Sequence, residues 1–274
     1  MIDAHVHFYD PGRPEGIPHP KPETPLLYRR MLPGDFRREL GASGMTAVVM
    51  IECSPWVEDN QWALELAGAE PLIGAVVGHL RPDTPEFPGL LRRFQRNPLF
   101  RGVRVRPGVV SHAAARTALG RLTEFGLTLD VLAGEQEFDD IIKLAREFPQ
   151  LPIVLNHLGL VSPGPPDNFP RWAAGLRRLA ENPAVFCKVS AVTETASTWT
   201  GVPAPAEYAP LLDVAEATFG PGRLIFGSNW PPCLRAANFS ATVEAVRNHL
   251  CLVGMRWCVK SWPGMPFVSM VESV

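Results

Sequence analysis

Short apolar runs rich in β-branched residues recur eight times along the chain, and each is followed by a longer stretch with amphipathic spacing. The runs are Ile2–Phe8, Thr46–Cys53, Leu72–Leu80, Phe100–Arg106, Leu127–Leu132, Pro152–His157, Val185–Val192 and Leu224–Gly227. Nearly continuous apolar runs are typical of parallel strands buried on both faces. Eight strand–helix repeats therefore predict an α/β protein with a (β/α)8 TIM barrel.

Several of the intervening segments carry apolar residues at helical spacing. We predict helices at Asp59–Ala69, Phe138–Phe148, Trp172–Leu179, Tyr208–Phe219 and Ala241–Val253, with Gly44, Gly126 and Gly220 just past helix ends. An open doubly wound sheet is the alternative arrangement of these elements. The first predicted strand is not followed by a GxGxxG turn, so that alternative lacks its usual marker.

Length and composition point to one barrel-sized domain, residues 1–274, with no linker that would divide it. The net charge of −2 gives no reason to expect a nucleic-acid or anionic-membrane partner. The five cysteines are odd in number and lack CxxC spacing, and the first residues have no signal-peptide pattern, so we expect a cytoplasmic protein. A homo-oligomer is compatible with the sequence.

Two segments depart from the repeating pattern. Pro11–Pro25 is too rich in proline for a helix or a central strand, and we expect a long loop on the catalytic face or a tolerated surface insertion. The stretch 255–274 contains two Trp, three Met and two Pro without helical period. A neighbouring reading frame would instead encode a capped helix and a Gly-Asn turn. Our hypothesis is a frameshift, which resequencing of the gene would test.

Three histidines fall where a barrel places its active site. His5 and His7 are two residues apart on the first predicted strand, so their side chains share one face. His157 ends the sixth strand, and functional residues of such barrels lie at the C-terminal ends of strands. Three imidazoles suit one divalent metal ion, zinc first, with a fourth position left for water. Hydrogen-bonded core histidines are the structural alternative.

The eighth predicted strand ends in Gly227-Ser228-Asn229-Trp230-Pro231. Together with His5-Val6-His7 and the strand-end His157, this motif resembles the lactonase branch of the amidohydrolase superfamily, over about residues 2–253. That branch includes fuconolactonase-like, rhamnonolactonase-like and pyrone-dicarboxylate lactonase-like enzymes. The resemblance implies a barrel of the metal-dependent-hydrolase type that opens a lactone by attack of water. In this superfamily the carboxylated lysine that bridges two metal ions comes from the fourth strand. The fourth predicted strand here offers arginine and no lysine, so we expect at most one metal ion.

In lactonases of that branch, the position of Asn229 is often an aspartate that acts as general base. An amide cannot accept a proton at neutral pH, so the usual base is missing here. The substitutes we consider are a histidine of the first strand, His157 or Glu52. In this prediction His5, His7, His157 and Asn229 are the catalytic residues.

Further polar and aromatic side chains near strand ends are candidates for substrate binding: Arg104, Glu52, Trp56, Lys188 and Trp230. An inward Arg104 would hold a carboxylate, unless it pairs with Glu52 or Asp130. Lys188 would bind substrate or neutralise Asp130 or Glu194. The aromatic residues would stack on a ring or simply pack in a lid.

These features support three functional hypotheses. The first is a hydrolase of a small sugar-type or carboxylated lactone, with one metal ion or with histidines acting directly. The second is a metal-dependent decarboxylase of the same fold, although Asn229 lacks the carboxylate that such a metal site needs. The third is a catalytically inactive binding protein, suggested by Asn229 and by the unusual tail.

Overall fold

A computed structural model describes residues 1–41, 43–160, 169–194 and 205–252 of the chain. It contains one eight-stranded parallel sheet in the order β1 to β8. The strands are β1 (Ile2–Val6), β2 (Ala47–Ile51), β3 (Ile73–His79), β4 (Phe100–Val105), β5 (Thr128–Val131), β6 (Ile153–Leu155), β7 (Val185–Val189) and β8 (Leu224–Phe226). All eight lie inside the predicted runs, so the (β/α)8 barrel is confirmed and the doubly wound alternative is excluded.

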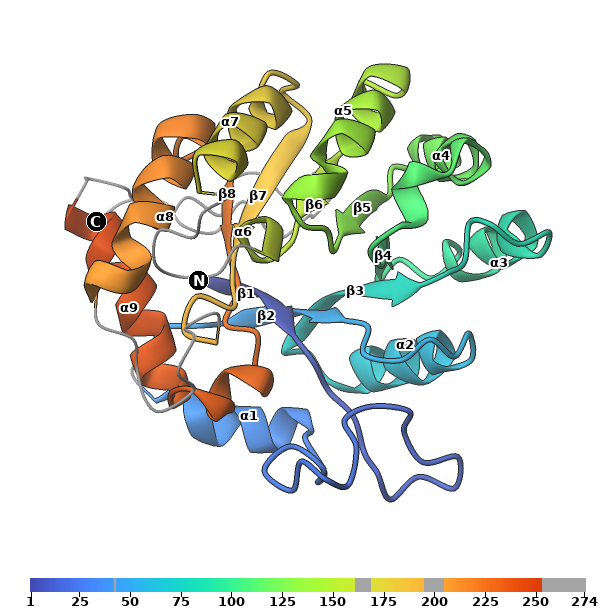
Figure 1. Cartoon of the computed structure of the whole chain (residues 1–274). Coiled ribbons are helices and arrows are strands. Elements are labelled where there is room, and N and C mark those ends of the chain that lie inside the picture. The colour runs from blue at the N-terminus through green and yellow to red at the C-terminus, as the bar shows by residue number, and fades with distance from the viewer. Residues whose placement is uncertain (42, 161–168, 195–204, 253–274) are drawn as a thin grey trace.

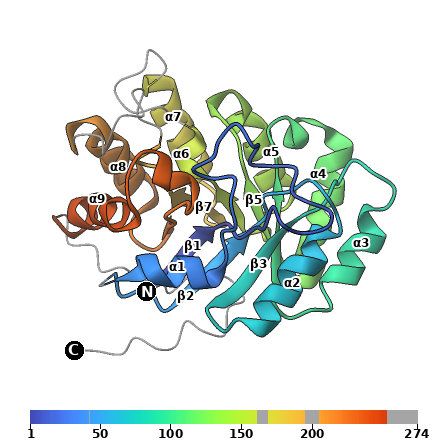
Figure 2. The same ribbon diagram turned by 90° about the horizontal axis from the view of Figure 1, so that it is seen from below.

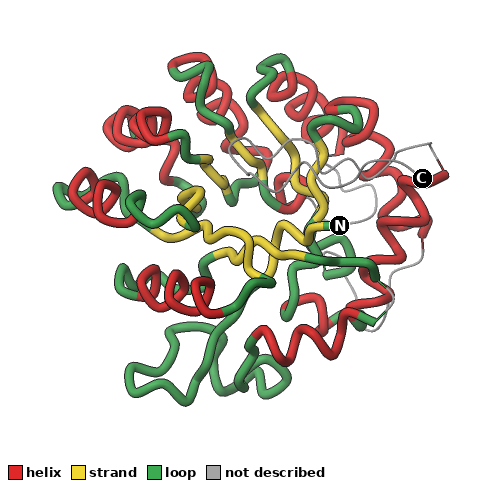
Figure 3. Tube along the Cα trace, turned by 180° about the vertical axis from the view of Figure 1, so that it is seen from behind, coloured by secondary structure: helices red, strands yellow, loops and turns green. Residues whose placement is uncertain are grey.

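Helices surround the strands as an outer ring, apart from a four-residue segment that follows β6 (Figures 1 and 3). They are α1 (Pro33–Leu40), α2 (Asp59–Ala69), α3 (Phe87–Phe94), α4 (Ala113–Gly120), α5 (Phe138–Glu147), α6 (His157–Leu160), α7 (Phe169–Ala180), α8 (Pro205–Phe219) and α9 (Phe239–Leu252), with the 3₁₀ turns η1 (Val109–Ser111), η2 (Arg121–Phe125), η3 (Glu135–Glu137) and η4 (Pro232–Arg235). The five predicted helices are present, whereas α1, α3 and α4 were not foreseen. Their apolar side chains, such as Phe36 and Leu91, form the main core together with the outward faces of the strands.

The barrel closes where β8 meets β1. The backbone N–H of Asn229 donates to the carbonyl oxygen of His5 at 2.9 Å, and the backbone N–H of His7 donates to the carbonyl oxygen of Trp230 at 2.8 Å. The buried carboxylate of Asp3 adds a link, because its Oδ1 accepts from the backbone N–H groups of His5 and Ser228. The residues of the first and last strand ends are therefore held in fixed register.

Gly227 makes this close approach sterically feasible. A Cβ atom at this position would lie 2.4 Å from the Cβ of His5 and 3.1 Å from its backbone nitrogen. We expect Gly227→Ala to lower the free energy of unfolding by about 1–3 kcal/mol, since the strands must separate to admit the methyl group. Denaturant unfolding measures this. The control is Gly222→Ala, where no atom lies within 4 Å of the added Cβ; equal stability of the two variants would contradict the prediction.

The proline-rich segment forms a long loop between β1 and α1, as predicted. It extends beyond the ring of helices near α1 and α2, and it lies in front of the barrel in the view from below (Figures 1 and 2). The loop is tied to the barrel by an antiparallel bridge between Tyr9 and Met31. The tail at 255–274 lies outside the described residues. Within the described part of the chain, no helix is long and apolar enough to cross a bilayer.

Candidate active site

The three predicted histidines meet at the C-terminal ends of the strands. The ring centre of His5 lies 5.0 Å from that of His7 and 4.5 Å from that of His157. All three side chains are buried. His5 belongs to β1, His7 follows it, and His157 comes two residues after β6. The two-residue spacing of His5 and His7 and the strand-end position of His157 therefore predicted correctly that these three side chains meet.

A left-handed turn aims His157 into the site. The φ values are positive at four successive residues: 53° at His157, 54° at Leu158, 76° at Gly159 and 52° at Leu160. Residues other than glycine rarely adopt this backbone conformation. The residues Ala191 and Asn229, which follow β7 and β8, also have positive φ values of 56° and 59°. Backbone strain of this kind is concentrated at functional sites, where the surrounding structure maintains it. Every described non-glycine residue with positive φ lies after β6, β7 or β8.

Hydrogen bonds fix the tautomers of two of these imidazoles. The Nδ1 atom of His7 lies 2.9 Å from the carbonyl oxygen of Ile51, which can only accept, so Nδ1 carries the proton and Nε2 presents a lone pair. The Nε2 atom of His157 lies 3.5 Å from a guanidinium nitrogen of Arg104, which can only donate. Neutral His157 therefore donates from Nδ1 to the hydroxyl of Ser190 at 2.8 Å. Ser190 was not singled out from the sequence.

The imidazoles are neutral at physiological pH. Burial lowers the pKa of His7 to about 3, and the positive charge of Arg104 acts in the same direction. Burial also lowers the pKa values of His5 and His157 well below their usual range. The next largest influence on the pKa of His5 is the neighbouring His157, and that on the pKa of His157 is the charge of Arg104. Both ring nitrogens of His5 lack a hydrogen-bond partner among the described residues. His5 therefore keeps one donor and one acceptor for a bound molecule.

Three neutral imidazoles are suitable donors for zinc, but their arrangement does not form a ligand set. The lone pair of His157 Nε2 faces the Arg104 guanidinium, whose charge would repel a cation. Among the residues that the structure describes, no group of three His, Cys, Asp or Glu side chains is placed to hold a metal ion. A metal centre at His5, His7 and His157 stays a prediction, and it requires Arg104 to move.

Arg104 connects the histidines to Glu52. Its guanidinium lies 3.6 Å from a carboxylate oxygen of Glu52 and 3.4 Å from the Glu52 carbonyl oxygen. The more exposed Arg106 contacts the other oxygen of the same carboxylate at 3.4 Å. The predicted pairing of Arg104 with Glu52 is therefore present. The Nε atom of Arg104 is buried and has no hydrogen-bond partner among the described residues, so Arg104 keeps one donor for a bound molecule.

Asn229 is joined to a carboxylate that the sequence analysis did not assign to the site. Its Nδ2 donates to Oε1 of Glu194 at 2.6 Å, and Oε2 of Glu194 accepts from Thr193 at 2.9 Å. Burial raises the pKa of Glu194 to about 7, although these hydrogen bonds act in the opposite direction. The sequence signal was its place after β7, five residues beyond Val189. Glu194 had been considered only as a partner of Lys188.

Lys188 belongs to β7 and is fully buried. Its ammonium donates to Asp130 at 2.6 Å, and Asn156 donates to the same carboxylate oxygen at 2.8 Å. Among the two carboxylates considered for Lys188, the structure places Asp130 beside it. This arrangement supports the structural role over substrate binding.

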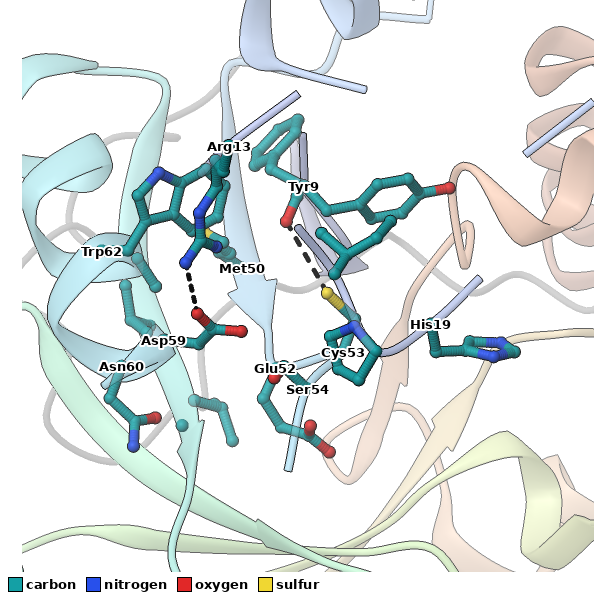
Figure 4. A pocket seen from close by; sticks show the side chains of 17 residues that line it. Tyr9, Arg13, His19, Met50, Glu52, Cys53, Ser54, Asp59, Asn60 and Trp62 are labelled. Carbon is teal, nitrogen blue, oxygen red and sulfur yellow. Dashed lines mark hydrogen bonds and ion pairs between the residues drawn. The ribbon is translucent and has the colours of Figure 1, made fainter. Parts of the chain in front are cut away.

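The two predicted aromatic residues have different surroundings. Trp230 is buried, and its ring packs at 5.2 Å from Phe36 and 5.9 Å from Phe8. Trp56 is 41% exposed after β2. A neighbouring crevice lies between the loop after β1 and the β2–α2 segment, where Arg13 reaches Asp59 at 2.6 Å and Glu52 forms one wall (Figure 4). These ring contacts support a packing role for Trp230, and stacking on a substrate stays a prediction.

Comparisons with known proteins identify the family of this chain. Residues 2–247 match the model of a family described as amidohydrolase. The chain is 30% identical to an L-fucono-1,5-lactonase of Burkholderia multivorans over 89% of this chain and 86% of the relative, and 27% identical to one of Burkholderia ambifaria over 87% and 82%. It is also similar to a Burkholderia multivorans amidohydrolase solved with bound zinc, at 29% identity and a TM-score of 0.81, covering 92% and 91% of the two chains. The chain belongs to the amidohydrolase family of enzymes.

Proposed function

We propose that this protein hydrolyses a small lactone of the sugar or carboxylated type. The observation that carries the proposal is the convergence of three neutral imidazoles, Arg104 and Asn229 at the strand ends. The L-fucono-1,5-lactonases at 27–30% identity support a cyclic ester as the substrate class. Likeness to two decarboxylases at 12–14% identity concerns the fold alone, so it lends no support to decarboxylation.

The side chains divide the work of ester hydrolysis. Arg104 donates hydrogen bonds to the lactone carbonyl oxygen, where negative charge develops as water attacks. The lone pair of His7 accepts a hydrogen bond from the attacking water and orients it, whereas the lone pair of His157 accepts from Arg104 and holds the guanidinium in place. His5 donates its remaining N–H to the lactone, and the amide of Asn229 fixes the position of the water without taking its proton. Trp56, Lys188, Glu52 and Trp230 have no step assigned in this scheme.

The deciding experiment is a pH-indicator assay of the purified protein with a panel of aldonolactones and pyrone lactones. We expect acid release above the spontaneous rate for at least one lactone. No release from any of them, with decarboxylation of aromatic acids, would replace the proposal by the second hypothesis. No turnover of either class, together with a large gain in Asn229→Asp, would establish an inactive binding protein.

The same assay, run with and without a chelator, addresses zinc. The metal content of the protein is measured in parallel by mass spectrometry. One zinc ion per chain with loss of activity on chelation would show that His157 leaves Arg104 to bind metal. Activity that is insensitive to chelator would assign the three histidines to direct hydrogen bonding.

We place the reaction in the cytoplasm on the basis of the scattered cysteines.

A further inference from the structure

Lactone hydrolysis at this site requires a group that accepts the proton of the attacking water, and Asn229 cannot do so. The imidazoles are poorly suited to hold a proton, because burial and, to a smaller extent, the positive charges of Arg104 and Lys188 lower the pKa values of His5 and His157. Glu52 is held by two guanidinium groups, those of Arg104 and Arg106. The carboxylate of Glu194, by contrast, is bonded to the side-chain amide of Asn229, to which the proposed scheme assigns the attacking water.

We propose that Glu194 is the general base of this site and supplies the carboxylate function that Asn229 lacks. The inference rests on the proposed lactone hydrolysis. Its geometric basis is the 2.6 Å hydrogen bond from Asn229 to Glu194 Oε1, at the mouth of the barrel where β7 and β8 end. A carboxylate offers about four acceptor positions. Asn229, Thr193 and the backbone N–H of Glu194 itself bond to this one, which leaves one position for water.

The step balances without a further reactant. The water oxygen forms a bond to the carbonyl carbon as the C=O π pair moves onto the carbonyl oxygen, and the water O–H bond breaks with its proton passing to the Glu194 carboxylate. The C=O bond then re-forms as the ring C–O bond breaks, and the leaving oxygen takes the proton from Glu194. The product is a hydroxy acid whose carboxyl group releases a proton to solvent, and Glu194 ends as the carboxylate. The enzyme is thereby returned to its starting state.

The surroundings of Glu194 suit this role at neutral pH. Burial raises the pKa of Glu194 to about 7, near the value that makes a base most effective. Two neighbours come from η4: Arg235, whose positive charge acts in the opposite direction, and Cys233, whose thiol pKa burial raises so far that it stays uncharged. Thr193 is in turn close to Thr242 of α9, so uncharged groups flank the carboxylate on that side.

The test is Glu194→Gln, compared with Glu124→Gln at the exposed turn η2. Glutamine can still accept the hydrogen bond from Asn229, so a purely positioning role would survive the substitution. We expect kcat to fall about 10²–10⁴-fold with KM little changed. Wild-type kcat should rise with pH through about 7, because the carboxylate form is required, and this acid limb should vanish in Glu194→Gln. Glu124→Gln should retain both the rate and the limb.

A swapped double variant, Glu194→Gln with Asn229→Asp, strengthens the test. It returns one carboxylate to the pair of side chains, and its kcat should be at least 10-fold higher than that of Glu194→Gln. The infrared difference spectrum between wild type and Glu194→Gln is recorded without substrate. It should show the band of a protonated carboxyl group, and this band should disappear near neutral pH. A wild-type-like kcat and acid limb in Glu194→Gln would overturn the base while leaving lactone hydrolysis intact. Failure of the wild type to hydrolyse any lactone would overturn both.

Glu194→Gln is expected to fold. The raised pKa of Glu194 means that the folded state binds a proton more tightly than the unfolded chain, so ionisation of Glu194 costs stability as pH rises from about 4.5 to about 7. Glutamine removes that cost above pH 7. Thermal melts at pH 8 should therefore show Glu194→Gln at least as stable as wild type, which separates loss of the base from loss of the fold.

Discussion

Replacing His157 by asparagine is expected to lower kcat for lactone hydrolysis by about 10²–10³-fold while the barrel stays folded. His157 accepts from the Arg104 guanidinium and donates to Ser190, so its ring holds the group that polarises the carbonyl. Without the ring, Arg104 loses one of the groups that hold its guanidinium in position to polarise the lactone carbonyl. Steady-state kinetics of the two proteins measure the effect.

Asparagine is chosen because it tolerates the left-handed conformation better than other side chains, and His157 has a φ of 53°. Leu160→Asn is the matched control, since Leu160 ends the same turn with a φ of 52° but is 43% exposed. Any cost of placing asparagine in this turn appears in both variants. Equal activity of the two variants would show that His157 takes no part in the reaction.

The barrel could be predicted from the sequence because burial on both faces forces each strand to be almost wholly apolar. Val48, Val103 and Ile153 are completely buried, as this pattern requires. The helices α1, α3 and α4 were missed for a local reason. Pro33 and Pro88 lie in the first turns of α1 and α3, where proline is tolerated, and these helices are only eight residues long.

The site was predictable only where the strand period determines direction. His5, His7 and His157 were found because side chains two apart on a strand, and those at strand ends, point toward the barrel mouth. The bond between Asn229 and Glu194 depends on how the segments after β7 and β8 fold over the strand ends. Trp230 has the same strand-end signal but turns outward to Phe36, so residue type and position alone could not separate a binding wall from packing.

Lys188→Met is expected to lower the free energy of unfolding by about 3–5 kcal/mol, because it leaves the carboxylate of Asp130 buried without its cation. Both side chains are fully buried and only 2.6 Å apart. Asn156 still donates to Asp130, but one neutral hydrogen bond cannot replace the ammonium. Denaturant unfolding at pH 7 gives the value.

Lys143→Met provides the control, since Lys143 pairs with Asp140 at a similar 2.8 Å while its side chain is 59% exposed. That variant should lose less than about 1 kcal/mol, because solvent screens an exposed ion pair. Adding Asp130→Asn to Lys188→Met should recover part of the loss by removing the orphaned charge. If Lys188→Met instead keeps its stability and raises KM for the lactone, Lys188 binds substrate, and the buried pair with Asp130 is not what the barrel requires of it.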